Sequence, residues 1–237
     1  MEQPSFRHEL KFLIAPYQAY VLRQRLRCLL QPDPHAGPTG RYRITSLYFD
    51  DVADSALFDK LAGVGDRQKI RVRIYNGSPE TILLEKKVKR GDGIHKEREQ
   101  IGLPIYEAMR QGDPAPLLDS DSLLLREVGW LMTHRLLRPK VVVDYVREAY
   151  LYAAGNVRVT FDQDLRSGLT NLDLFNEAPL VPALVDELWI MEVKYDAFLP
   201  RPVQDLIQFE GLNRLAASKY VICRSLVKQH EWEDTLV

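Results

Sequence analysis

Basic side chains recur at every second position in segments whose hydrophobicity alternates. In residues 67–75, Arg71 and Arg73 fall on one side, and isoleucine and valine fall on the other. Side chains two positions apart point to the same face of a β-strand. Arginine binds phosphate oxygens as a planar fork, and lysine binds them as a point charge. Strand faces of this kind indicate a site for phosphate groups.

The charged faces of the alternating segments carry far more basic than acidic residues. Eleven basic residues fall on them: Arg7, Lys11, Arg71, Arg73, Lys87, Lys89, Lys96, Arg98, Arg147, Arg158 and Lys194. Four acidic residues join them: Glu9, Glu85, Asp162 and Glu192. Two like charges about 6 Å apart repel by roughly 3 kcal/mol at an effective dielectric of 20, so a bound polyanion would stabilise the set. An ordinary solvated sheet face is the alternative, and it explains any single strand well.

The elements that position these faces follow from the periodicity. Strands are predicted over residues 6–14, 41–49, 67–75, 81–89, 94–101, 140–152, 157–164 and 187–195. Helices are predicted over 16–30, 54–62 with Asp54 as N-cap, 104–137 with a break near GDPAP, 201–216 and 220–230. Tight turns at NGSP and at Gly91-Asp92-Gly93 indicate antiparallel pairing.

Eight antiparallel strands are enough to close a barrel, and no βαβ alternation is present. We therefore expect an α+β fold, in which an eight-stranded antiparallel β-barrel is flanked by helices. The apolar strand faces would pack against the helices, and the basic faces would line a polar tunnel. Carboxylates in such a tunnel suit Mg²⁺ or Mn²⁺, which bridge carboxylate and phosphate oxygens. The residues thus predict a metal-assisted site for a linear polyphosphate or a nucleoside triphosphate.

The basic faces belong to a chain that is almost neutral overall. The 237 residues include 32 Lys and Arg and 33 Asp and Glu, for a net charge of −1. This balance excludes a strongly basic nucleic-acid-coating protein, so no nucleic acid partner is expected. Two distant cysteines exclude a disulfide framework. No apolar leader and no run of about 18 apolar residues occur, which predicts a single-domain cytoplasmic protein without a transmembrane segment.

Eight segments, in this order along the chain, resemble the VTC (vacuolar transporter chaperone) domain: RHELKFLI, SLYFDD, KIRVRIY, LEKKVKRGDGIHKER, VDYVREAY, VRVTFD, IMEVKY and SKY. That domain is the polyphosphate polymerase module of the triphosphate tunnel metalloenzyme, or CYTH-like, superfamily. The resemblance spans about residues 5 to 225. It implies an eight-stranded tunnel that transfers the γ-phosphate of ATP to a growing inorganic polyphosphate chain, with Mn²⁺ or Mg²⁺, and releases ADP.

The resemblance also implies roles for individual residues. Phosphate-binding catalytic positions match Arg71, Arg73, Lys87, Lys96, Arg147 and Arg158, and the metal-holding glutamate matches Glu192. Lys11 and Lys219 match further substrate contacts, and Lys89, Arg98 and Lys194 join them as basic strand residues. Asp162 is a second candidate metal ligand, although an ion pair with Arg158 fits it at least as well. Glu85 beside Lys87 fits either a structural ion pair or a ligand.

Two departures from the pattern bear on the reaction. Tunnel triphosphatases open with ExExK, whereas the first strand here reads Arg7-His8-Glu9-Leu10-Lys11, which favours the polymerase branch over the hydrolytic one. The resembling polymerase subunits carry an SPX domain and membrane helices, which this sequence lacks, so a separate membrane partner would be needed for translocation. A tunnel hydrolase of inorganic or nucleoside triphosphate and a non-catalytic polyphosphate-binding module stay open as alternatives.

Overall fold

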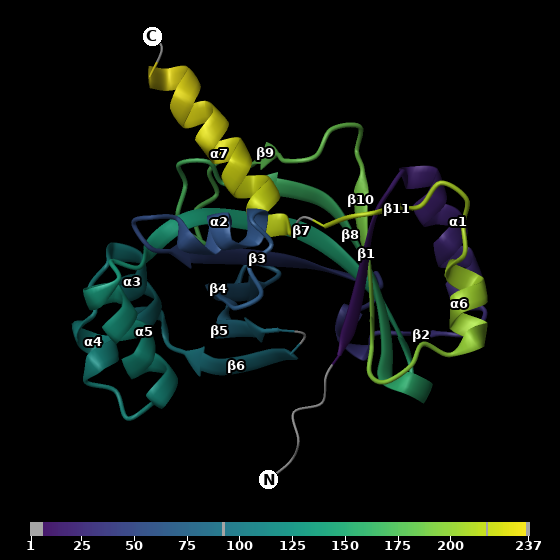
Figure 1. Cartoon of the computed structure of the whole chain (residues 1–237), viewed down its shortest axis with the longest axis horizontal. Coiled ribbons are helices and arrows are strands. Elements are labelled where there is room, and N and C mark those ends of the chain that lie inside the picture. The colour runs from purple at the N-terminus through teal and green to yellow at the C-terminus, as the bar shows by residue number, and fades with distance from the viewer. Residues whose placement is uncertain (1–6, 92, 217, 236–237) are drawn as a thin grey trace. The chain divides into compact units, whose positions relative to one another are not determined.

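The computed structural model describes residues 7–91, 93–216 and 218–235 (Figure 1). Phe6 of the first predicted strand and Asp92 of the predicted turn lie outside these residues. The chain divides into two compact units. Unit 1 comprises Met1–Arg43, Tyr145–Leu165 and Leu184–Ser218, and unit 2 comprises Ile44–Asp144, Arg166–Ala183 and Lys219–Val237. The organisation as one domain stays a prediction, and each unit is described by itself.

Unit 1 is an antiparallel sheet with two helices. Its elements are β1 (His8–Ile14), α1 (Pro16–Arg27), β2 (Gln31–Pro32), the short 3-10 helices Pro34–Ala36 and Ala154–Asn156, β10 (Trp189–Tyr195), α6 (Arg201–Ile207) and β11 (Asn213–Arg214), with parts of β3 (Arg41–Asp50), β7 (Arg138–Tyr152) and β8 (Val157–Ser167). The strands are ordered β11-β1-β10-β8-β7, and β2 pairs with β7.

The core of unit 1 lies on one face of this sheet. On α1, Ala19, Leu22 and Leu26 are buried at helical spacing. They belong to one apolar cluster with the odd-numbered residues of β8, among them Val159 and Phe161. The even-numbered residues of β8 must therefore project from the opposite face of the sheet. Alternation thus separates the apolar and polar faces as the sequence predicted.

Unit 2 is a second antiparallel arrangement with its own helices. It contains α2 (Ser55–Leu61), β4 (Arg67–Tyr75), β5 (Ser78–Arg90), β6 (Gly93–Ile101), α3 (Leu103–Gln111), α4 (Ala115–Leu118), α5 (Leu123–His134), β9 (Val181–Pro182), α7 (Lys219–Thr235) and the remaining parts of β3, β7 and β8. The strand order is β7-β3-β4-β5-β6, and β9 pairs with the end of β8. In Figure 1, α3, α4 and α5 form one group at an end of β5 and β6.

The apolar core of unit 2 joins alternate strand residues to these helices. Ile70 and Val72 of β4 and Leu84 of β5 are buried in one cluster with Tyr106 of α3 and Val128 of α5. The arginines of β4 therefore project from the other face.

The predicted NGSP turn is a two-residue hairpin loop. Asn76 and Gly77 have φ of 52° and 70°, and Tyr75 pairs with Ser78. A loop of this type needs two left-handed residues, which Asn-Gly supplies. The register then shifts between Tyr75 and Arg73, where Arg73 pairs with Leu83, so an irregularity separates the turn from the rest of the β4–β5 ladder.

All eight predicted strands are present, with bounds within three residues of those expected. The mixed α+β class and the antiparallel pairing are confirmed. Among the described residues the strand order ends at β11 on one side and at β6 on the other, so a closed barrel is not shown. The two-residue strands β2, β9 and β11 were not predicted, because so short a segment carries no periodicity.

The predicted helix over 201–216 is wrong in its second half. Helix α6 ends at Ile207, and Gly211 has a φ of 74°, which no helix residue adopts. Asn213 and Arg214 then pair with Leu13 and Phe12 of β1. This pairing satisfies backbone groups at the outer edge of β1 that would otherwise depend on water.

The prediction of Asp54 as N-cap is right in position and wrong in function. Asp54 occupies the N-cap position of α2, but its side chain makes no capping hydrogen bond among the described residues. Its carboxylate lies 2.6 Å from Lys228 Nζ and 3.3 Å from Arg224 Nη2 instead. The backbone N–H groups of Ala56 and Leu57 donate to Asp50. The carboxylate of Asp50 therefore caps α2. Asp54 instead links α2 to α7 through its ion pairs.

Candidate functional site

In unit 2, three strands place Arg71, Arg73 and Lys96 around the carboxylate of Glu85. Arg71 Nε donates to Glu85 Oε2 at 2.6 Å, and Arg73 Nη1 lies 3.7 Å from the same oxygen. Lys96 Nζ donates to Oε1. Glu85 is 3% exposed, so its charge needs these partners. Three cations around one carboxylate leave an excess positive charge on this face of unit 2.

A row of three lysines lies beside this cluster. In the strand register, Lys69 of β4 is directly opposite Lys87 of β5, and Lys87 is directly opposite Lys96 of β6. Side chains directly opposite each other have Cβ atoms about 5 Å apart, and like charges in such pairs are destabilising. A sheet that keeps three lysines in one row is suited to bind an anion across them.

The polar face around these residues includes groups that orient the arginines. Arg71 Nη1 donates to the Tyr48 hydroxyl at 2.7 Å, and Arg73 Nε donates to Ser46 Oγ at 3.2 Å. Both partners belong to β3, directly opposite the arginines in the register. Each guanidinium is thus held on two sides, by Glu85 and by a hydroxyl group of β3.

The charges around Glu85 change how it titrates. Burial alone would raise the pKa of Glu85, but the positive charges of Arg71, Arg73 and Lys96 outweigh burial and hold the pKa well below the usual range. Burial also lowers the pKa of Lys96, and the neighbouring arginines add to that effect against the attraction of Glu85. The cluster thus stabilises the charged form of Glu85. Burial and the two arginines destabilise the charged form of Lys96.

Replacing Glu85 by glutamine is expected to reduce the free energy of unfolding by about 1–3 kcal/mol at pH 7, because three cations lose their counter-charge. Since the folded-state pKa of Glu85 is lowered, its contribution is complete above about pH 5 and declines as the pH falls toward the folded-state value. The difference between wild type and Glu85→Gln in urea unfolding should therefore shrink from pH 5 downward. Glu80→Gln, on an exposed part of β5, is the control and should change little. A difference that does not depend on pH would contradict this assignment.

In unit 1, Glu192 of β10 is the centre of a second polar cluster. Lys194 Nζ lies 3.1 Å from Glu192 Oε2, and Lys11 Nζ lies 3.8 Å from Oε1. Arg147 Nη2 is 4.0 Å from Glu192. Glu9 completes the cluster, 3.4 Å from Lys11 and 3.5 Å from Lys194. These predicted site residues therefore meet within one unit, but here carboxylates nearly balance the cations.

Asp162 forms a buried, bidentate ion pair with Arg147. Arg147 Nε and Nη2 donate to the two carboxylate oxygens at 2.6 and 2.8 Å. Burial lowers the pKa of Arg147, but the charge of Asp162 raises it well above the usual range. The expected ion pair of Asp162 with Arg158 is thus wrong in its partner. Arg158 Nη2 instead donates to Asp33 Oδ2 at 2.7 Å and to the Tyr42 hydroxyl at 2.8 Å.

The side chains present fit a divalent cation only in a limited way. Among the described residues, no three His, Cys, Asp or Glu side chains gather into a metal-binding group. Both oxygens of Asp162 are already bonded to Arg147. Glu192 remains, with Glu9 beside it on the same lysines, and Mg²⁺ uses one or two carboxylates together with substrate phosphates. A cation at Glu192 would therefore depend on the phosphates of its substrate.

The remaining predicted site residues lie in unit 2. Lys89 pairs in register with Arg67, and Arg98 is directly opposite Glu85. Lys219 is buried and is the first residue of α7. Sequence reasoning missed Lys69, although it has the same parity as Arg71 and Arg73. It also missed Asp33, which lies in an irregular segment without periodicity.

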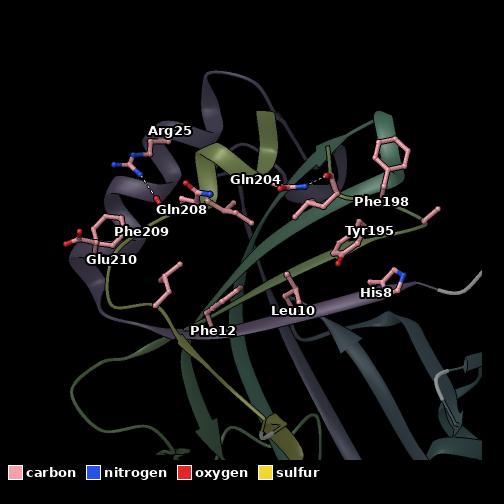
Figure 2. A pocket seen from close by; sticks show the side chains of 14 residues that line it. His8, Leu10, Phe12, Arg25, Tyr195, Phe198, Gln204, Gln208, Phe209 and Glu210 are labelled. Atoms are coloured by element: carbon pink, nitrogen blue, oxygen red, sulfur yellow. Dashed lines mark hydrogen bonds between the residues drawn. The ribbon is translucent and has the colours of Figure 1, made fainter. Parts of the chain in front are cut away.

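A cavity in unit 1 lies on the apolar side of β1. It has a volume of about 1160 Å³, and Figure 2 shows His8, Leu10 and Phe12 of β1 pointing into it. His8 stacks on Tyr195 with ring centroids 5.1 Å apart. None of the predicted site residues lines this cavity. It opens on the face of β1 opposite to Lys11, so it is separate from the Glu192 cluster.

Comparison with solved structures finds several similar proteins. A putative adenylyl cyclase from Hippeastrum, described as having a dominant triphosphatase activity, superposes with a TM-score of 0.56 at 19% identity, over 92% of this chain and 94% of the other. A putative adenylate cyclase from Bacillus halodurans gives 0.48 at 10% identity, over 87% of each chain. The PH1819 protein from Pyrococcus horikoshii OT3 gives 0.47 at 12%, over 94% and 99%. The first likeness shows a common fold.

No curated protein matches the sequence. Nor is any helix in the described part of the chain long and apolar enough to cross a membrane. The family model of the VTC domain matches residues 6–228, a range that includes every strand described above. The chain therefore belongs to the VTC domain family.

Proposed function

We propose that this protein is a polyphosphate polymerase, which transfers the γ-phosphate of ATP to the end of an inorganic polyphosphate chain. The observation that carries the proposal is the row Lys69, Lys87 and Lys96, next to the three cations around Glu85. The row extends across three strands, so it offers successive cations along a line rather than a pocket for one phosphate. A linear polyanion is the ligand whose charge repeats in that way.

The reaction needs positioning and charge neutralisation more than protein nucleophiles. An ionised terminal oxygen of the polyphosphate attacks the γ-phosphorus of ATP, the bond to the β–γ bridging oxygen breaks, and ADP leaves with that oxygen. Arg71 and Arg73, held by Tyr48 and Ser46, would bind phosphoryl oxygens and neutralise charge in the transition state. Lys87 and Lys96 would hold the neighbouring phosphates.

In unit 1, Glu192 would hold a divalent cation, Mn²⁺ or Mg²⁺, together with phosphate oxygens. Such a cation supplies neutralisation of the phosphate charge when it is bound. Arg147 is fixed by both oxygens of Asp162, so it is a pre-oriented cation 4.0 Å from Glu192. Asp162 accordingly acts in the proposal by positioning Arg147, and the sequence-based assignment of Asp162 as a metal ligand has less support. The closed eight-stranded tunnel and a membrane-embedded partner remain predictions.

Incubation of the protein with ATP and Mn²⁺ is expected to produce long-chain polyphosphate and ADP, with one ADP released for each phosphate added to the polymer. Gel electrophoresis with polyphosphate staining detects the first product, and chromatography quantifies the second. Incubation with EDTA in place of the metal is the control and should give neither. ADP with free phosphate and no polymer would overturn the transferase assignment.

A triphosphatase is the second candidate, because the Hippeastrum protein that shares this fold is described as having a dominant triphosphatase activity. Against it stands Arg7, which occupies the place of the first glutamate in the ExExK pattern. Arg7 Nε lies 3.1 Å from Asp196, so it forms a surface ion pair. Release of phosphate from tripolyphosphate, without polymer from ATP, would identify this alternative.

A further inference from the structure

Two buried donors on one face of β8 in unit 1 have no hydrogen-bond partner among the residues that the structure describes. They are Arg158 Nε and Thr160 Oγ1. The two residues are two positions apart, so their side chains share a face and are spaced about 6.7 Å along the strand. Thr160 is 1% exposed, and leaving its hydroxyl unsatisfied costs stability. Buried polar groups without partners in a folded protein call for a ligand or a water.

The surroundings of these donors point to an anion. Arg158 donates to Asp33 and to the Tyr42 hydroxyl through Nη2, and Nε takes part in neither hydrogen bond. Lys194 of β10 is directly opposite Arg158 in the register, so two cations face each other across the strands. Arginine Nε can only donate, so its missing partner is an acceptor and not a metal ion. A phosphate oxygen satisfies all of these groups, whereas a cation satisfies none but the hydroxyl.

We propose that the Thr160 hydroxyl is a phosphate ligand, which binds a phosphate oxygen of the polyphosphate or triphosphate together with Arg158 Nε and Lys194. This assignment deepens the proposed function and rests on it. Glu192 is directly opposite Thr160 and is engaged by Lys11 and Lys194. The hydroxyl therefore contributes a neutral donor where the carboxylates would otherwise repel a phosphate. It adds one hydrogen bond without adding charge.

The test uses Thr160→Val, which keeps the shape of the side chain and removes the hydroxyl. Titration of the 237-residue chain with tripolyphosphate, in EDTA and separately with Mn²⁺, gives the Kd, and thermal melting without ligand gives the Tm. We expect the Kd of Thr160→Val to rise about tenfold under both conditions, since a hydrogen bond to a charged group is lost. The Tm without ligand should be unchanged or higher, because an unsatisfied buried hydroxyl is gone. Thr160→Ser should restore affinity close to that of the wild type.

A matched control is Thr45→Val in β3. The Thr45 hydroxyl is also buried but donates to Asp144 Oδ2 at 2.7 Å, so its loss should lower the Tm and leave the Kd unchanged. An unchanged Kd in Thr160→Val, or a lowered Tm without ligand, would overturn the assignment. A loss of affinity confined to Mn²⁺ would assign the hydroxyl to the metal and overturn it too. Failure of the wild type to bind tripolyphosphate would refute the proposed function itself.

Discussion

Arg73→Ala is expected to lower the rate of polyphosphate synthesis by about 10²–10³-fold, the usual effect of losing one preorganised donor to a developing charge. Arg73 is buried against Ser46 and lies 3.7 Å from Glu85. Glu85 keeps Arg71 and Lys96 in the variant, so the carboxylate is still paired. The fold should therefore survive, and far-ultraviolet circular dichroism should match the wild type while the production of ADP from ATP collapses.

Two further variants sharpen that result. Arg73→Lys keeps the charge but loses the planar fork, and it should recover only part of the activity. Arg201→Ala removes an exposed arginine whose partner is Asp205, and its rate should equal that of the wild type. Near-normal synthesis by Arg73→Ala would remove this arginine from the proposed machinery.

Asp162→Asn is expected to lower the free energy of unfolding by about 3–5 kcal/mol, because it leaves the buried guanidinium of Arg147 without its counter-charge. Asp162 is 1% exposed, and both of its oxygens accept from Arg147. Denaturation in urea measures the loss. The exposed pair Arg201 and Asp205 provides the comparison, since Asp205→Asn should cost less than about 1 kcal/mol.

A double variant distinguishes positioning from metal binding. Arg147→Met with Asp162→Leu replaces the pair by apolar side chains of similar size, and such exchanges are often neutral for stability. We expect the double variant to be more stable than Asp162→Asn alone and to be inactive. If Asp162→Asn instead keeps full stability and mainly raises the concentration of Mn²⁺ required for activity, then Asp162 is a metal ligand and not the support of Arg147.

The polar faces were predictable because alternation alone decides which side of a strand a residue occupies. Arg71, Glu85 and Lys96 were expected on one face, and they are in contact there. Parity alone did not identify the partner of Asp162. Arg158 has the same parity but lies four positions away on β8 itself, about 13 Å along the strand, whereas Arg147 lies on the neighbouring strand β7. Contact between Arg147 and Asp162 depends on the register of β7 with β8, which the intervening turn determines.

Other features depended on tertiary context. Asp33 follows Pro32 in an irregular segment, and only the fold brings it to Arg158. Residues 208–216 have a composition that a helix tolerates, but pairing of Asn213 and Arg214 with β1 replaces it. Local helix propensity is a weak predictor of helix where a segment can instead pair with the open edge of a strand.

The partners of β1 have a consequence for how the molecule is made. The strands that pair with β1 in the described chain are β10 and β11, which begin at Trp189 and Asn213. During translation, the first strand therefore leaves the ribosome long before either neighbour exists. Unit 2 places β3, β4, β5 and β6 in consecutive order, and its hairpins can form early. The sheet of unit 1 can therefore be completed only near the end of synthesis. Until then β1 is an open edge in the nascent chain, where chaperone binding or aggregation competes with folding.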